Sequence, residues 1–203
     1  MTAKVTRVKV FDNTALLREL TSFNGKLYFH AAPFQNSTIY KEGGQTASVI
    51  WETDGTEEGT KLLYDFAPGP AEFVPSKLRV ANNHLFIEVR IDSDPSHYEL
   101  WSLQQSSHSS NFTEPIKLVD SLNGRFPDWR FDDRIEPTSE GLFFLQKDSE
   151  GRNELWFTNG KPGAANTYSL GGNTSGAPLN NFVKLIGGDN TLYFIADGSE
   201  SVP

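Results

Sequence analysis

The sequence predicts an all-β protein, a β-propeller of about four blades in which each blade is a four-stranded antiparallel unit. Three observations predict this fold. A short apolar core recurs four times along the 203 residues, and a tryptophan follows three of these cores. Three apolar runs that end in aspartate keep the same order. A repeat of 50 to 58 residues that holds four strands fits a propeller blade better than a solenoid coil or a sandwich.

The recurring apolar core is expected to form the second strand of each unit, called strand b. Its residues are apolar without interruption, as in strands that are covered on both faces. A two-residue turn candidate stands before each core, which predicts a tight hairpin from a preceding strand a. The four cores are Leu27-Tyr28-Phe29, Leu85-Phe86-Ile87, Leu142-Phe143-Phe144 and Leu192-Tyr193-Phe194.

The tryptophans mark strand c, and the runs that end in aspartate mark strand d. Polar and apolar positions are mixed in these strands, as in strands nearer to solvent. In the second unit the four strands are expected at 77–81, 84–90, 98–103 and 115–120. Only the stretch from Ala15 to Leu20 is compatible with a helix.

The units are expected to form a single β-propeller domain over residues 1–203. The repeat units are approximately 14–66, 73–120, 130–170, and 180–203 together with 3–12. The last blade is incomplete because it has no strand c, and the N-terminal strand at 5–11 is expected to close it. An open edge there would allow strand pairing with a partner or with a second copy. The alternative is a fragment of a larger propeller.

The connection between strands c and d in the first unit carries a motif. It contains Trp51-Glu52-Thr53-Asp54-Gly55-Thr56-Glu57-Glu58-Gly59-Thr60. This string resembles the ELWxxDGT repeat, also called hyalin-like, of large bacterial surface or secreted proteins. The match is partial at Glu154 to Gly160 and weak at Glu99 to Trp101. The resemblance implies a propeller-like fold and a binding or surface role.

The same resemblance suggests an extracellular or cell-surface location. The first residues of the chain lack the apolar stretch of a signal peptide, so the sequence by itself leaves the localisation unknown.

The motif residues are expected to be structural, with a ligand site as the alternative. An Asp-Gly pair supplies the positive backbone dihedrals of a tight turn, and threonine hydroxyls bond the local backbone. Tryptophan offers a broad apolar surface between blades. The set is Trp51, Asp54, Gly55, Thr56, Gly59, Thr60, Trp101 and Trp156.

Candidate ligand-binding residues lie in the long b–c and d–a loops, which are expected to share one end of the blades. An aromatic side chain beside carboxylates and arginines suits sugar or peptide recognition. In the alternative interpretation these charges solvate the surface and Trp129 packs under its own loop. The candidates are Tyr40, Asp92, Asp94, Trp129, Arg130, Asp132, Asp133 and Arg134.

No cofactor and no metal site is predicted, with calcium as the alternative. Closely spaced oxygen ligands stand at Asp92, Asp94, Asp148 and Glu150, but they complete no known calcium motif. The chain has no cysteine, which excludes thiolate metal ligands.

The expected function is non-catalytic recognition of a protein or a glycan, in a surface or multi-protein assembly. The net charge of −8 disfavours a nucleic-acid partner, and no apolar stretch is long enough for membrane insertion. The alternative is a glycan-active enzyme, a hydrolase or lyase that uses loop carboxylates such as Asp132 and Asp133. Adjacent carboxylates on an extended segment point apart, which does not suit hydrolysis.

Overall fold

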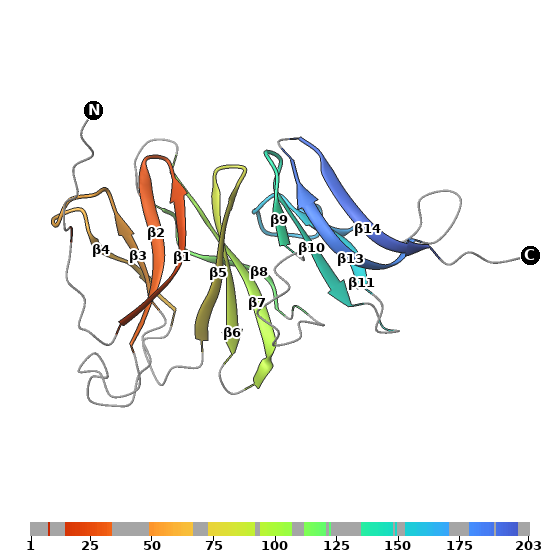
Figure 1. Ribbon diagram of the computed structural model, residues 1–203, viewed down its shortest axis with the longest axis horizontal. Helices are drawn as coiled ribbons and strands as arrows, with labels where there is room; N and C mark the ends of the chain where they lie inside the picture. The colour runs from red at the N-terminus through yellow and green to blue at the C-terminus, as the bar shows by residue number, and fades with distance from the viewer. Residues whose placement is uncertain are drawn as a thin grey trace, which may run out of the picture. The chain divides into compact units, whose positions relative to one another are not determined.

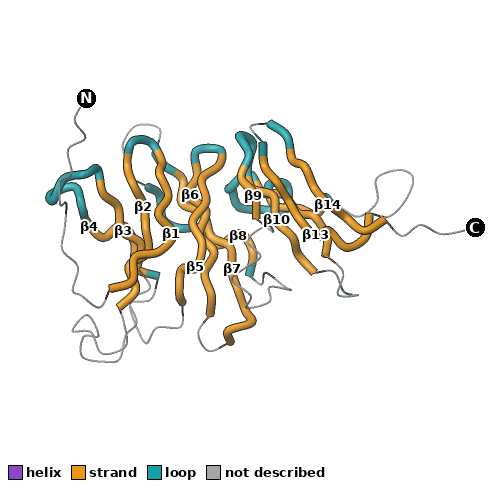
Figure 2. The backbone as a smooth tube through the Cα atoms, in the orientation of Figure 1, coloured by secondary structure: helices purple, strands orange, loops and turns teal. Residues whose placement is uncertain are grey.

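The computed structural model describes residues 8, 15–33, 49–66, 73–91, 94–106, 112–120, 122, 135–147, 149, 153–170, 179–188 and 190–198. These residues form strands β1 to β14 (Figure 1), which turns and loops connect (Figure 2). None of them belongs to a helix that is long and apolar enough to cross a membrane. Contacts group the chain into two compact units, Met1–Leu78 with Val89–Ser93 and Arg79–Glu88 with Asp94–Pro203.

The first sheet has four antiparallel strands in chain order. It contains β1 (Ala15–Phe23), β2 (Lys26–Pro33), β3 (Val49–Thr53) and β4 (Lys61–Asp65). The c–d turn that follows β3 lies beside the a–b turn, because Leu27 pairs with Thr53 and Phe23 pairs with Lys26. This is the arrangement of turns that the sequence predicts.

The stretch Ala15–Leu20, which by sequence is compatible with a helix, is instead the first part of β1. Its residues pair antiparallel with β2, with Leu17 opposite Ala31. The register shifts before Thr21, where Glu19 has a φ of 55°. Pairing with an apolar neighbour strand outweighs the helix propensity of a short leucine-rich segment.

The second sheet is built in the same way. It contains β5 (Phe73–Ala81), β6 (His84–Ile91), β7 (Asp94–Gln104) and β8 (Ile116–Val119), in chain order. Asn82 and Asn83 make the turn between β5 and β6 with φ values of 44° and 58°. Asparagine tolerates this left-handed region better than most residues do, so the two-residue turn was readable from sequence. Residues 84–89 of β6 are all buried, as its apolar pattern predicts.

The third sheet has four strands and the fourth sheet has two. The third contains β9 (Ile135–Pro137), β10 (Leu142–Lys147), β11 (Asn153–Thr158) and β12 (Thr167–Ser169). The fourth contains β13 (Leu179–Gly187) and β14 (Leu192–Gly198). The predicted all-β fold is therefore confirmed, with three repeated four-stranded antiparallel sheets and one two-stranded sheet. The N-terminal strand expected at 5–11 lies, except for residue 8, outside the described residues.

Apolar side chains from neighbouring sheets share their cores. Phe86 and Leu100 of the second sheet belong to one buried cluster with Leu142 and Phe144 of the third. Leu185 of the fourth sheet is fully buried in a second cluster with Leu145 and Leu155 of the third sheet. Leu118 and Val119 of β8 also pack against the first cluster, so the contact between the second and third sheets includes strand d as well as strands a, b and c.

Candidate functional site

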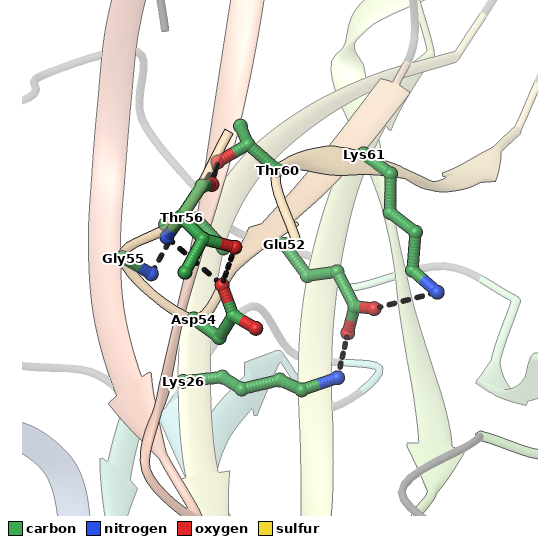
Figure 3. Close-up of polar contacts among 8 residues, drawn as sticks. Lys26, Glu52, Asp54, Gly55, Thr56, Thr60 and Lys61 are labelled. Atoms are coloured by element: carbon green, nitrogen blue, oxygen red, sulfur yellow. Dashed lines mark hydrogen bonds and ion pairs between the residues drawn. The ribbon is translucent and has the colours of Figure 1, made fainter. Parts of the chain in front are cut away.

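The turn between β3 and β4 is held by its own side chains (Figure 3). Asp54 Oδ1 accepts hydrogen bonds from the Thr56 backbone N–H at 2.9 Å and from the Thr56 hydroxyl at 2.7 Å. The Thr56 hydroxyl oxygen accepts a bond from Gly59 N–H at 2.9 Å, and the hydroxyls of Thr53 and Thr60 lie 2.7 Å apart. These bonds to Thr56 hold the pKa of the exposed Asp54 carboxyl below its usual value.

The third sheet repeats this turn between β11 and β12 with different residues. The hydroxyls of Thr158 and Thr167 also lie 2.7 Å apart, and Thr158 Oγ1 accepts a bond from Gly160 N–H at 3.2 Å. Asn159 Oδ1 accepts from the Lys161 backbone N–H at 3.0 Å, in the role of Asp54. The two turns share the threonine pair and the bond from the glycine N–H to the first threonine, although the paired threonines are seven residues apart in one and nine in the other.

The third sheet's turn is docked on the second sheet, within one compact unit. Gly160 O accepts a 2.6 Å hydrogen bond from the buried Ser102 hydroxyl, and Asn159 O accepts one from Asn82 Nδ2 at 3.2 Å. A Cβ added to Gly160 would lie 2.6 Å from the ring of His84. A Cβ on Gly55, by contrast, would meet no described atom within 4 Å.

A glutamate accepts a hydrogen bond from the tryptophan of strand c in two of the units. Trp101 Nε1 donates to Glu99 Oε2 at 2.7 Å, and Trp156 Nε1 donates to Glu154 Oε2 at 2.9 Å. The residues are two apart on a strand, so their side chains lie on the same face. The Lys117 ammonium also lies 5.7 Å from the centre of the Trp101 ring. The bonds fix the orientation of each indole.

A buried carboxylate, Glu52, occupies the end of the first sheet. Lys26 Nζ lies 3.1 Å and Lys61 Nζ lies 3.4 Å from its two oxygens (Figure 3). Burial, together with the charge of Glu52, raises the pKa of Tyr28 to about 12. The two lysines compensate the carboxylate, so this cluster joins strands β2, β3 and β4.

A groove of ≈ 410 Å³ opens beside Trp156, between strands of the second and third sheets that belong to one compact unit. Strand β8 and the residue after it supply one wall, and β10, β11, the β11–β12 turn and the first residue of β12 supply the other. Its floor and walls combine apolar side chains with a carboxylate, an amide and a hydroxyl. The lining residues are Leu118, Val119, Asp120, Gln146, Trp156, Gly163, Ala164 and Thr167.

The groove carries a fixed negative charge at its rim. Asp120 Oδ1 lies 2.5 Å from Lys117 Nζ, and the Asp120 side chain is 81% exposed. This lysine lowers the pKa of the Asp120 carboxyl, and Asp120 with Glu99 raises the pKa of Lys117. Asp120 is therefore ionised at neutral pH and accepts hydrogen bonds only.

Most of the ligand-binding residues predicted from sequence lie outside the described residues. These are Tyr40, Asp92, Trp129, Arg130, Asp132, Asp133 and Arg134, together with the calcium candidates Asp148 and Glu150. Asp94 begins β7, and nothing further is described of its side chain. Among the residues that the structure describes, no three histidine, cysteine, aspartate or glutamate side chains gather as metal ligands would.

The sequence identifies two residues of the groove as part of the repeat, but it does not predict that they form a site. Asp120 closes an apolar run of strand d, and Trp156 stands in the series of strand c tryptophans. Gln146 and Thr167 carry no signal in the sequence that singles them out. The one hint in the sequence was that an aspartate ends strand d of one unit and a tryptophan lies in strand c of the next.

A scan against protein-family models found no match for this chain, and a search of curated proteins found none either. The likeness to the ELWxxDGT repeat rests on the residues quoted for it.

Proposed function

We propose that this protein is a non-catalytic binding module that recognises a glycan through the groove beside Trp156. In this proposal the sheets are blades of a β-propeller of about four blades, as in ELWxxDGT repeat proteins, and the module acts at a surface or in an assembly. The repeated four-stranded antiparallel sheets in chain order support the propeller, because a blade has this order of strands.

The observation that carries the glycan assignment is the composition of the groove. Its volume of ≈ 410 Å³ falls within the range of small-molecule sites, about 300–1,000 Å³. Leu118 and Trp156 offer apolar surface, and an aromatic ring packs well against the C–H face of a sugar ring.

The polar groups of the groove suit sugar hydroxyls. Asp120 accepts hydrogen bonds, Gln146 both donates and accepts, and the Thr167 hydroxyl does the same. Asp120 is charged, so its bonds to ligand hydroxyls are stronger than neutral ones. A groove with one carboxylate at its rim binds neutral or cationic sugars better than acidic ones.

A glycan array with and without calcium, followed by titration of the best hit, tests this proposal. Asp120→Asn removes the charge of an exposed side chain, and we expect the Kd of the hit to rise about tenfold because a charge-assisted bond is lost. The matched control is Asp65→Asn, the aspartate that ends strand d (β4) of the first sheet, which should leave the Kd unchanged. An array without hits, or an unchanged Kd in Asp120→Asn, would contradict a glycan in this groove and favour a protein ligand.

A further inference from the structure

The turn between β11 and β12 has one part docked on the second sheet and another part that lines the groove. Gly160 is the docked residue, because its backbone lies against the His84 ring and its carbonyl oxygen accepts the Ser102 hydroxyl. Gly163 and Ala164 of the same turn line the groove. The position of this groove wall therefore depends on the docking of the turn.

Hydrogen bonds inside the turn connect its docked part to its groove part. Asn159 N–H donates to Asn166 O at 3.0 Å, and Asn159 Nδ2 donates to Asn166 Oδ1 at 2.8 Å. Gly163 O accepts bonds from Asn166 N–H at 2.9 Å and from Thr167 N–H at 3.1 Å. Because these bonds join Gly160 and its neighbour to the residues of the groove wall, a displacement of the docked part also moves the wall.

His84 lies against the docked residue as a neutral imidazole. Its side chain is 2% exposed, and its Nδ1 lies 2.6 Å from the carbonyl oxygen of Asn82. A carbonyl oxygen only accepts hydrogen bonds, so the proton of the neutral ring is on Nδ1 and a second proton would bind at Nε2.

The groups that meet at this contact do not compensate a positive charge on the ring. Asn82 and Ser102 of the second sheet are uncharged, and each bonds the turn through a carbonyl oxygen. Lys161 of the turn is a cation that acts on His84. Burial, together with the charge of Lys161, holds the pKa of His84 below its ordinary value of 6.5.

Protonation of His84 is therefore less costly when the turn is away from the ring. Water then reaches the imidazole and Lys161 is no longer held near it, so the pKa of His84 returns toward its ordinary value. The proton binds the undocked arrangement more tightly than the docked one. Acid consequently shifts the equilibrium toward the undocked turn.

We propose that protonation of His84 releases the β11–β12 turn from the second sheet and so lowers the affinity of the groove for its ligand. While His84 is neutral, the docked turn keeps Gly163 and Thr167 in the groove wall. The effect on affinity rests on the proposed function of the groove, whereas the release of the turn does not.

The first test needs no ligand. The Gly160 N–H is buried and bonds Thr158 Oγ1 at 3.2 Å, so we expect it to exchange with deuterated water only when the turn opens. Its exchange rate, measured by NMR on the full chain and corrected for the intrinsic pH dependence of amide exchange, gives the opening constant of the turn. From about pH 7.5 to about pH 5.5 we expect this constant to rise about tenfold.

An amide of the same sheet and a second histidine serve as controls. Leu170 N–H bonds Leu155 O at 2.9 Å within the third sheet, and its opening constant should not change over this pH range. His97→Gln alters a less buried histidine and should retain the rise at Gly160. An opening constant of Gly160 that does not rise in acid, or an equal rise at Leu170, would overturn the proposal.

Two variants assign the effect to His84. His84→Gln removes the titrating group and should make the opening constant of Gly160 independent of pH. Since His84 is buried, Lys161→Gln provides a second variant at an exposed side chain. It removes the cation that opposes protonation of the docked ring, so the total rise should shrink to about threefold. An undiminished rise in both variants would contradict a role of His84.

The second test measures the Kd of the best glycan-array hit on the unaltered chain over the same pH range. We expect the Kd to rise at least about threefold in acid, because the competent arrangement of the groove becomes less populated. The rise should be absent in His84→Gln. Asp120→Asn should raise the Kd at both ends of the range and retain the pH effect, since the Asp120 carboxyl has a lowered pKa and stays ionised.

The two tests separate this inference from the proposed function. An array without hits at about pH 7.5 would contradict glycan binding, and the exchange of Gly160 would still decide whether acid releases the turn. A hit whose Kd does not change with pH would support glycan binding and overturn the control of the groove by His84.

Discussion

At the scale of single residues, the two turn glycines form a matched pair. Gly55 and Gly160 have nearly the same backbone angle, with φ values of 92° and 91°. They differ in surroundings, because only Gly160 lies against the ring of His84. Comparing substitutions at the two positions therefore separates the energetic cost of a side chain at positive φ from the cost of losing the contact with His84.

We expect Gly55→Ala to lower the free energy of unfolding by about 1 kcal/mol, the cost of placing alanine at a positive φ. Gly160→Ala should cost about 1–3 kcal/mol more, because its Cβ overlaps the His84 ring. Urea denaturation of both variants measures the difference. Equal losses would show that Gly160 does not pack against His84.

At the scale of strands and turns, the threonine pairs are expected to contribute unequally. Thr158 is fully buried and its hydroxyl bonds the buried N–H of Gly160, whereas Thr53 bonds the exposed N–H of Gly55. A buried donor that loses its acceptor costs about 1–3 kcal/mol, while water replaces the acceptor at an exposed one. The bond at Thr158 therefore matters more.

Thr158→Val keeps the shape of the side chain and should lower the free energy of unfolding by about 1–3 kcal/mol. Thr53→Val should lower it by less than about 1 kcal/mol. Chemical denaturation of both variants checks this order. A larger loss in the free energy of unfolding for Thr53→Val would contradict this order and show that the bond in the first turn contributes more.

Strand positions were predictable because local pattern determines them. The apolar cores and the turns before them place β2, β6, β10 and β14. The stretch at Ala15–Leu20 was not predictable, since its helix propensity is a local property and its pairing with β2 is not.

The groove was not predictable for a related reason. Asp120 and Trp156 lie in different sheets, and only the packing of these sheets brings them to one groove. No local pattern states which strand ends will meet. The residue types of the groove can be read from the sequence, but which of them lie together depends on how the sheets pack.

At the scale of the whole molecule, His84 links stability to pH. It is 2% exposed, and burial holds its pKa below the ordinary value of 6.5. The unfolded chain therefore binds this proton more readily than the folded chain does. Its contribution is complete above the unfolded pKa and is lost as pH falls toward the lowered folded pKa.

We expect the free energy of unfolding to fall as pH drops below the ordinary histidine pKa of 6.5, with a slope from this residue of at most about 1.4 kcal/mol per pH unit. His84→Gln should remove that slope, and His97→Gln, in a less buried place, should retain it. Urea denaturation across this pH range measures both. An unchanged slope in His84→Gln would assign the pH dependence to other groups.

The turn at Gly160 contacts Ser102 and His84 of the second sheet, so a substitution in this turn affects the stability of more than its own sheet. A substitution in the turn at Gly160 removes packing and hydrogen-bond contacts with the second sheet, because Gly160 O accepts a bond from Ser102. Substitutions in the turn at Gly160 are therefore expected to destabilise the second sheet as well as the third. The turn at Gly55, where an added Cβ meets no described atom within 4 Å, has no such effect on another sheet.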